Sequence, residues 1–242
     1  MLLTVLILAP AALGTGGAAW WFAAGSAVLF FARRPWEIWL QTRPETDATA
    51  RAAALALFAL GLGLGAVGLW VTARPQTAVL AVAAAALAAL SAYTESDTKK
   101  RGAVAGRVAG AIAMVTLLLL QVEAAFGRIT PEGWGLAALC FVYFLTSGLR
   151  VRSLVRARKV EGFRRVSLAL HGAALVGAAV AGRAGLVPAW SWLGFAPGFL
   201  QAIRILGRGD GPVNTLRMGV GEILHASAFI ALTVVAYRLG TS

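Results

Sequence analysis

Residues 52–71, AAALALFALGLGLGAVGLWV, form a run of apolar side chains that no charge interrupts. A helix rises about 1.5 Å per residue, so about 20 such residues cross the roughly 30 Å hydrocarbon layer of a membrane. Residues 103–120 form a second run of this kind, in which Arg107 is the only charged side chain. Both runs are apolar on all faces, whereas strands of a membrane barrel would alternate with polar positions. They predict membrane-spanning helices.

The rest of the chain repeats this pattern. Of its 242 residues, 59% are hydrophobic and only 13% are charged. We predict an all-α fold, a polytopic transmembrane bundle of about nine helices that forms a single integral membrane domain over residues 1–242. The predicted segments are 2–14, 18–32, 52–72, 76–93, 103–122, 134–149, 166–182, 186–206 and 218–237.

Basic residues predict the orientation of this bundle. Eighteen of the 22 Lys and Arg residues lie in or beside every second connection. They are Arg33, Arg34, Arg43, Arg51, Lys99, Lys100, Arg101, Arg107, Arg150, Arg152, Arg156, Arg158, Lys159, Arg164, Arg165, Arg204, Arg208 and Arg217. By the positive-inside rule, these connections and the amino terminus face the cytoplasm and the carboxyl terminus faces outside. Tryptophans at the opposite ends, among them Trp20, Trp70 and Trp134, fit an interfacial aromatic belt.

The formal net charge of +12 is explained by these connections. Clustered Lys and Arg beside membrane helices attract anionic lipid, by about 1 kcal/mol for each residue near the surface. We therefore expect the lipid bilayer as a partner and no nucleic acid. The single cysteine, Cys140, rules out an intramolecular disulfide and a thiolate metal cluster.

Glycine motifs in the apolar segments predict helix packing. Gly63, Gly65 and Gly68 spell GxGxxG, but the dinucleotide fingerprint requires a strand before the motif and a helix that opens after it. Here the motif lies inside an apolar helix, so no nucleotide site is predicted. Gly61 and Gly65 are four residues apart, and this spacing lets helix backbones approach closely in lipid.

Polar side chains inside the segments gather at one depth. Each costs several kcal/mol in a membrane unless it faces a partner or a wet cavity. His171, Gln201, Glu222, His225, Tyr143, Thr146 and Ser147 all lie in the cytoplasmic half, and the outer half offers little beyond Gln121 and Glu123. We infer a polar pocket that opens inward and is closed by apolar packing toward the outside.

Other interpretations of these residues stay open. His171, Gln201 and Glu222 could simply join helices through hydrogen bonds, which are typically worth ~0.6 kcal/mol each in membranes. His171 and His225, the only two histidines, could be axial ligands of a b-type haem. Glu222 and His225 have the Glu-x-x-His spacing of di-iron bundles, but it occurs once, so no metal site is predicted. The sequence identifies no cofactor.

Three blocks of the chain resemble the YwiC-like family of bacterial membrane proteins. They are residues 30–35 (FFARRP), 192–201 (WLGFAPGFLQ) and 214–225 (NTLRMGVGEILH). The resemblance implies a multi-pass protein of the bacterial cytoplasmic (inner) membrane. Members usually begin with a His-Gly-Ala-Trp-type segment that has no counterpart here, so we expect the natural start to lie upstream of Met1.

The nine-helix plan is also similar to that of UbiA-type prenyltransferases, whose pocket opens to the cytoplasm. In that superfamily, aspartate-rich motifs at the inner ends of two helices hold magnesium against a prenyl diphosphate. This chain has Arg33 and Arg34 at one of these points and Arg150 and Arg152 at the other. Magnesium ions lack a carboxylate cage there, but arginines could bind a phosphate or carboxylate directly through paired hydrogen bonds.

We therefore expect a cytoplasm-facing pocket for an anionic amphiphile of the lipid or prenyl phosphate type, in a divergent transferase or a non-catalytic binder. Whether the protein is an enzyme stays open, because no nucleophile is identified. The predicted ligand-binding residues are Arg33, Arg34, Arg150, Arg152, His171, Gln201, Glu222 and His225. The alternatives are a small-anion transporter, for which Pro197 and Gly198 could break the eighth segment, and a haem-binding or assembly component of a respiratory complex.

Overall fold

The computed structural model describes residues 2–14, 16–41, 48–96, 102–155, 162–207 and 215–240. Within these ranges the chain forms nine α-helices, one 3₁₀ helix and no strand. They are α1 (Leu2–Leu13), α2 (Ala19–Gln41), α3 (Ala48–Thr72), α4 (Pro75–Ser96), α5 (Gly102–Phe126), α6 (Pro131–Val155), α7 (Phe163–Arg183), η1 (Ser191–Phe195), α8 (Ala196–Leu206) and α9 (Thr215–Gly240). The predicted all-helical membrane fold is confirmed.

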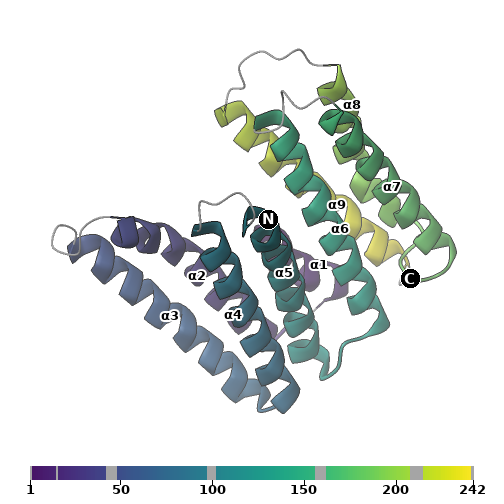
Figure 1. Cartoon of the computed structure of the whole chain (residues 1–242). Helices are drawn as coiled ribbons and strands as arrows, with labels where there is room; N and C mark the ends of the chain where they lie inside the picture. The colour runs from purple at the N-terminus through teal and green to yellow at the C-terminus, as the bar shows by residue number, and fades with distance from the viewer. Residues whose placement is uncertain are drawn as a thin grey trace.

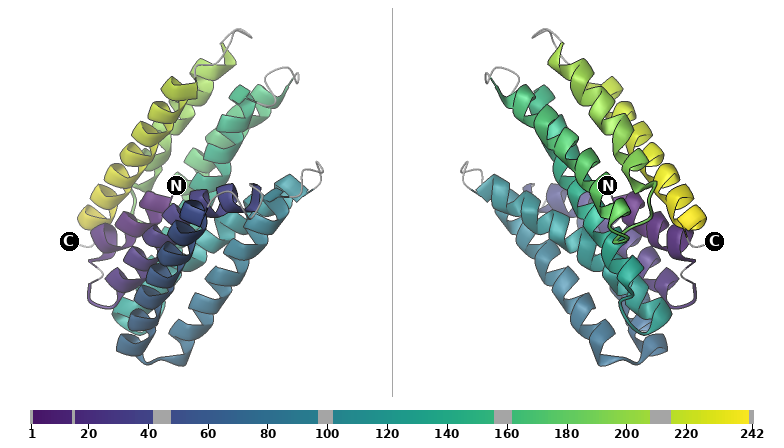
Figure 2. Two further views of the ribbon diagram at one scale, coloured as in Figure 1. Left: turned by 90° about the vertical axis from the view of Figure 1, so that its left-hand side faces the viewer. Right: turned by 90° about the vertical axis from the view of Figure 1, so that its right-hand side faces the viewer.

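Successive helices run in opposite directions, and two groups of them lie side by side (Figure 1). In one group, α2 packs along α3 and α4 packs along α5, while α6 to α9 form the other group. The two groups meet where α5 contacts α6, and α1 lies between them in contact with α2, α5, α6 and α9. Two further views show the helices of both groups spreading apart toward the end at which α3, α5, α7 and α9 begin (Figure 2).

Five of the described helices contain apolar spans long enough to cross a membrane. The spans are Arg51–Thr72, Val108–Phe126, Pro131–Leu154, Phe163–Arg183 and Leu216–Gly240. Shorter apolar stretches occupy Ala19–Leu29 and Pro75–Ser91. Two helices extend past their predicted carboxyl ends; α2 continues to Gln41 and α6 to Val155. Sequence analysis ended these two segments at residues 32 and 149, because hydropathy marks where apolar residues stop and not where the helix stops.

The eighth predicted segment is not a single helix, so this part of the prediction is wrong. After turns that follow Arg183, the chain forms η1 and only then the 11-residue α8. Pro188 and Pro197 explain the interruption, since proline lacks the backbone N–H that a continuous helix needs. At about 1.5 Å per residue, α8 covers little more than half of the hydrocarbon layer.

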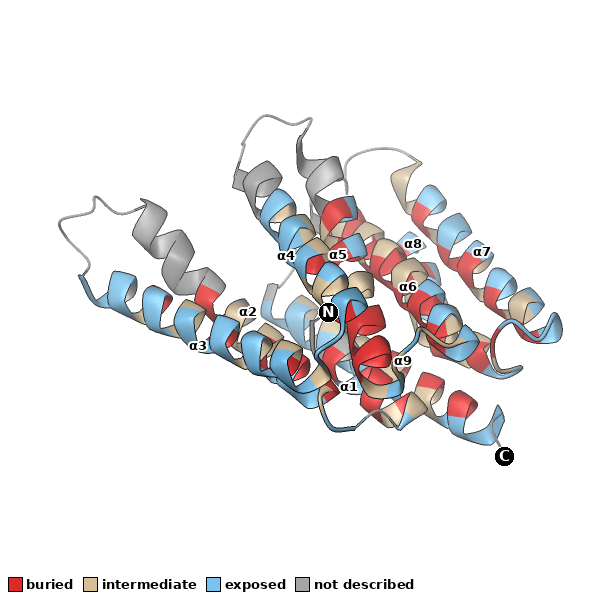
Figure 3. Cartoon of the chain, turned by 90° about the horizontal axis from the view of Figure 1, so that it is seen from below, coloured by how far each residue is buried: buried red, intermediate tan, exposed pale blue. Residues whose placement is uncertain are grey.

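The buried core lies mainly on α5, α6 and α1, as colouring by burial shows (Figure 3). It includes Leu8 from α1, Leu118 from α5, and Leu136 and Cys140 from α6. The apolar spans of α3 and α9 are mostly uncovered by protein. Such uncovered apolar helix faces match a lipid environment, in which lipid tails take the place of a protein core. Exposed Trp20 and Trp134 lie where α2 and α6 begin, and exposed Trp70 lies where α3 ends.

Small residues bring α2 and α3 into close contact. A Cβ atom added to Gly25 would lie 2.9 Å from the carbonyl oxygen of Gly61 and 3.3 Å from the backbone nitrogen of Gly65. One added to Gly61 would lie 2.6 Å from Cγ of Leu29. The predicted packing role of Gly61 is confirmed, whereas a Cβ atom added to Gly65 would meet no other atom within 4 Å, so Gly65 contributes only its backbone to this contact. Gly63, one of the other glycines in this helix, has open space at the same position.

We expect Gly61→Leu to destabilise the protein by about 1 to 3 kcal/mol, because the new side chain must push α2 away from α3. Gly63→Leu is the matched control; its side chain would point into open space and should leave the melting temperature unchanged or raised. Tryptophan-fluorescence melting of both variants in mild detergent checks this. Equal melting temperatures for the two variants would contradict the assigned α2–α3 contact.

Candidate functional site

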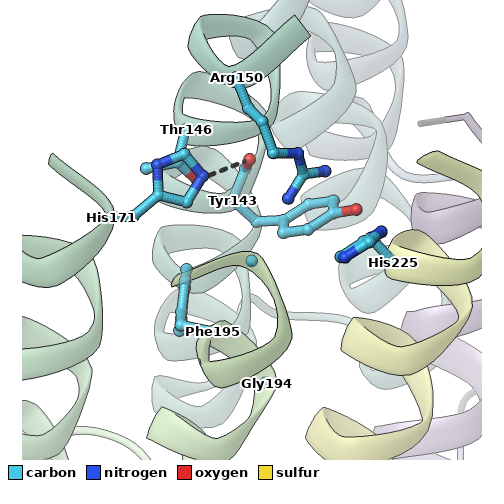
Figure 4. Close-up of a pocket in the computed structure, with 8 residues that line it drawn as sticks. Tyr143, Thr146, Arg150, His171, Gly194, Phe195 and His225 are labelled. Atoms are coloured by element: carbon cyan, nitrogen blue, oxygen red, sulfur yellow. Dashed lines mark hydrogen bonds between the residues drawn. The ribbon is translucent and has the colours of Figure 1, made fainter. Parts of the chain in front are cut away.

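Side chains from five elements surround a small hollow in the second group of helices (Figure 4). Its cavity volume is only about 10 Å³, close to the least that holds one water molecule. Small-molecule sites typically measure about 300–1,000 Å³, so the hollow admits one small polar group and not a whole cofactor. It is lined by Tyr143, Thr146 and Arg150 of α6, His171 of α7, Gly194 and Phe195 of η1, Gly198 of α8 and His225 of α9.

The contribution of α6 follows from helical spacing. Tyr143, Thr146 and Arg150 are separated by three and four residues, so they share one face of the helix. Ser147, beside them, also points toward α9 and donates a hydrogen bond to Glu222. Thr146 donates to the backbone carbonyl of Val142 at 2.9 Å, so its hydroxyl is satisfied within the helix.

Arg150 and Glu222 form a bidentate ion pair between α6 and α9. Nε of Arg150 donates to Oε1 of Glu222 at 3.0 Å, and Nη2 donates to Oε2 at 2.6 Å. The hydroxyl of Ser147 adds a third hydrogen bond, also to Oε2, at 3.0 Å. Arg150 is 1% exposed and Glu222 is 22% exposed. A buried arginine next to apolar helices requires such a partner, and the carboxylate supplies the opposite charge.

His171 presents an unsatisfied nitrogen to the hollow. Its Nδ1 lies 2.7 Å from the backbone carbonyl of Ser167, which can only accept, so in the neutral ring Nδ1 carries the proton. Nε2 is then an acceptor, and it is buried without a hydrogen-bond partner among the described residues. The whole side chain is 4% exposed. Buried polar atoms are rarely left unpaired, so this one calls for an explanation.

Gly198 leaves space beside both of these side chains. A Cβ atom at this position would lie 3.2 Å from Nη1 of Arg150 and 3.8 Å from Nε2 of His171. Nη1 is the guanidinium nitrogen that the Glu222 pair does not use. The donor Nη1 of Arg150 and the acceptor Nε2 of His171 therefore both lie next to the space that a side chain at position 198 would fill. A group with both hydrogen-bonding capacities, such as a hydroxyl, could contact the two atoms together.

His225 faces the hollow from α9, on the opposite side from His171 (Figure 4). Its Nδ1 lies 2.5 Å from the backbone carbonyl of Gly221, so Nδ1 carries the proton in the neutral ring, as in His171. Both imidazoles are thus oriented by a carbonyl one turn earlier in their own helix. No group of three His, Cys, Asp or Glu side chains is placed to hold a metal ion within the described ranges.

Three aromatic rings pack together beside the hollow, and those of Tyr143 and Phe195 line it. Phe229 lies one turn beyond His225, and its ring stacks on Tyr143 with centroids 4.0 Å apart and an interplanar angle of 12°. Phe195 meets Phe229 edge to face at 5.5 Å. Offset stacks and edge-to-face pairs are favourable aromatic geometries, so the three rings form a continuous apolar layer.

Four of the eight predicted ligand-binding residues meet at this place. Arg150, His171 and His225 line the hollow, and Glu222 binds Arg150. Arg152 instead lies over the ring of Phe163, 5.5 Å from its centroid. Gln201 is half-buried on α8, outside the lining, with Oε1 unpaired. For Arg33 and Arg34 only the backbone of α2 is described, and their side chains lie outside the described part.

Sequence analysis missed Gly194, Phe195 and Gly198 as lining residues. Their signal was present in the run Gly194–Gly198, which interrupts an apolar segment with two glycines and a proline. Too few polar groups were also predicted in the half that was expected to face outside. The hydroxyls of Ser191 and Thr233 are buried there, and Thr77 donates a hydrogen bond to the buried carboxylate of Glu123.

Apolar helices of spanning length and uncovered apolar faces define the class: the protein is a multi-pass helical membrane protein. A family model, YwiC-like protein, matches residues 1–122. The chain therefore belongs to the YwiC-like family. Residues 30–35 fall inside the match, whereas the other two resembling blocks and the hollow lie in the carboxyl-terminal half. No curated protein and no solved structure matches the chain.

Proposed function

We propose that the hollow binds the head group of an anionic amphiphile, of the lipid or prenyl phosphate type, which enters from the cytoplasmic side. The observation that carries this proposal is the unpaired Nε2 of the buried His171 beside Nη1 of Arg150. Evolved cores seldom bury an acceptor without a partner. A ligand oxygen that carries a proton, such as the P–OH of a phosphate monoester, could lie beside Gly198, donate a hydrogen bond to Nε2 and accept one from the guanidinium.

The surroundings of the hollow support an amphiphile in preference to a fully polar solute. Phe195, Phe229 and Tyr143 form the apolar layer behind it, and helix faces bathed in lipid lie on either side. The hollow admits one small polar group of the ligand, while the rest of the head group and the tail would lie outside it, among the helices or in the bilayer. Arg33, Arg34 and Arg152 remain proposed contacts at the cytoplasmic mouth, where they would attract the negative head group, and Gln201 remains a proposed contact on α8.

A matched pair of glycine variants tests this site. Gly198→Ala places a methyl group where the ligand oxygen would lie, whereas Gly177→Ala on α7 points into open space. Both changes add one Cβ to a helix and raise its intrinsic propensity similarly. We expect wild type and Gly177→Ala to retain a small molecule in native mass spectrometry and to be stabilised by phosphatidic acid or farnesyl diphosphate. Gly198→Ala should lose both properties.

Farnesol and phosphatidylcholine serve as ligands without net charge in the same melting assay. Stabilisation by phosphatidic acid that is equal in wild type and Gly198→Ala would place the binding site elsewhere. The proposal would be contradicted if wild-type protein retained no small molecule in native mass spectrometry and none of the four compounds raised its melting temperature.

A small-anion transporter is the second candidate, supported by the interruption before α8. Broken helices that line a polar site near the membrane centre are typical of secondary transporters. Here Gly194 and Gly198, on the two sides of the break, both line the hollow. Phosphate uptake into proteoliposomes would separate transport from binding alone.

A further inference from the structure

At the hollow, the negative charge of Glu222 compensates the positive charge of Arg150. Two nitrogen atoms of Arg150 bind the two carboxylate oxygens of Glu222, and Ser147 adds a hydrogen bond to the same group. An anionic head group that settled beside this intact pair would bring a net negative charge into a region of low dielectric constant. Uncompensated charges in such surroundings are strongly disfavoured. The ligand therefore needs a positive charge that the protein does not yet offer.

The two partners of the pair differ in their freedom to move away. Arg150 is 1% exposed and is held among α6, α8 and His171, whereas Glu222 is 22% exposed on α9. Next to Glu222, Gly221 and Gly219 have open space where side chains would be. α6 and α9 are joined here through side chains, so a rotation of Glu222 would not require the helices to separate. Glu222 can turn toward the cytoplasmic end, while Arg150 stays.

On the basis of the proposed function, we propose that the position now held by the Glu222 carboxylate is the subsite for the anionic group of the ligand. Glu222 fills this subsite in the empty protein and leaves it when a phosphate or carboxylate takes its place. The incoming group has the geometry required, because phosphate and carboxylate oxygens accept the same paired N–H bonds from a guanidinium. The exchange conserves charge around Arg150, one anion replacing another.

The substitution Glu222→Gln tests the exchange. The amide oxygen can still accept a hydrogen bond from Ser147 or Arg150, but the internal negative charge is gone. We expect affinity for short-chain phosphatidic acid to rise about tenfold or more, because the ligand no longer displaces a charge-assisted partner. Affinity for short-chain phosphatidylcholine should stay the same. Glu132→Gln, at an exposed site on the opposite end of α6, is the matched control and should change neither affinity.

A second variant, Ser147→Ala, loosens the hold on Glu222 without altering any charge, and alanine is a better helix former than serine. It should raise phosphatidic acid affinity in the same direction by a smaller factor. If wild type binds phosphatidic acid and both variants bind it equally or more weakly, the subsite assignment is wrong and the binding site itself stands. Equal gains for both lipids would show a generally opened pocket and would also overturn the assignment. Failure of all proteins to bind either lipid would overturn the assignment and the proposed function together.

Discussion

Replacing Arg150 with alanine is expected to destabilise the protein by about 3 kcal/mol, the lower end of the range for breaking a buried ion pair. The substitution leaves the Glu222 carboxylate between α6 and α9 without its counter-charge. The lower end applies because Glu222 is partly exposed and can recover some hydration. The measurement is the melting temperature, or the unfolding free energy in mixed micelles, of the variant against wild type.

A double variant distinguishes the contribution of the ion pair to stability from that of the aliphatic part of the Arg150 side chain. Arg150→Met together with Glu222→Met removes both charges and keeps much of the buried volume, so it should be more stable than Arg150→Met alone. The coupling energy from the double-mutant cycle should be at least about 1 kcal/mol. A double variant as unstable as the sum of the two single changes would mean that the ion pair contributes nothing.

Phe229→Ala is expected to cost about 2 to 4 kcal/mol of stability, because it removes the ring at the centre of the apolar layer. Phe229 is fully buried, stacks on Tyr143 and meets Phe195 edge to face. Moving an apolar side chain into the protein is less favourable from lipid than from water. The stability cost of Phe229→Ala therefore arises mainly from the cavity and the lost contacts. The melting temperature of the purified variant reports it.

Two comparisons make this result specific. Phe229→Leu keeps an apolar side chain in the layer and should lose less than half as much stability as Phe229→Ala. Phe126→Ala, near the carboxyl end of α5, alters an exposed ring and should have little effect. Indistinguishable melting of Phe229→Ala and Phe126→Ala would show that the three rings do not support the bundle.

The helical framework could be predicted from the sequence because each membrane helix satisfies its own backbone and needs little information from distant residues. Hydropathy therefore located the nine helices of the described ranges, although the eighth segment was predicted too long, and the small-residue position Gly61 predicted one close contact. The break before α8 was predicted less well. Pro197 was noted only as a possible break, and no property of a single segment shows that its outer part folds as a 3₁₀ helix.

The sequence predicted how far along their helices the site residues lie, but not which of them bind one another. Counting along the helices placed His171, Glu222 and His225 at similar depth, and the structure brings all three to one place. Arg150 was expected to hold a ligand directly, yet it binds Glu222, which lies 72 positions away in the chain. Such pairing depends on how α6 and α9 are rotated about their axes. That rotation is set by packing against all their neighbours, and hydropathy does not encode it.

Cys140 lies fully buried in the middle of α6, and it is the only thiol in the chain. A maleimide reagent added to intact cells or sealed vesicles should therefore find nothing to react with in the unaltered protein. A cysteine introduced at any surface position would then be the only one that the reagent modifies, and Cys140 would not have to be replaced. The sidedness of every connection can thus be followed chemically in a protein that differs from the original by one side chain.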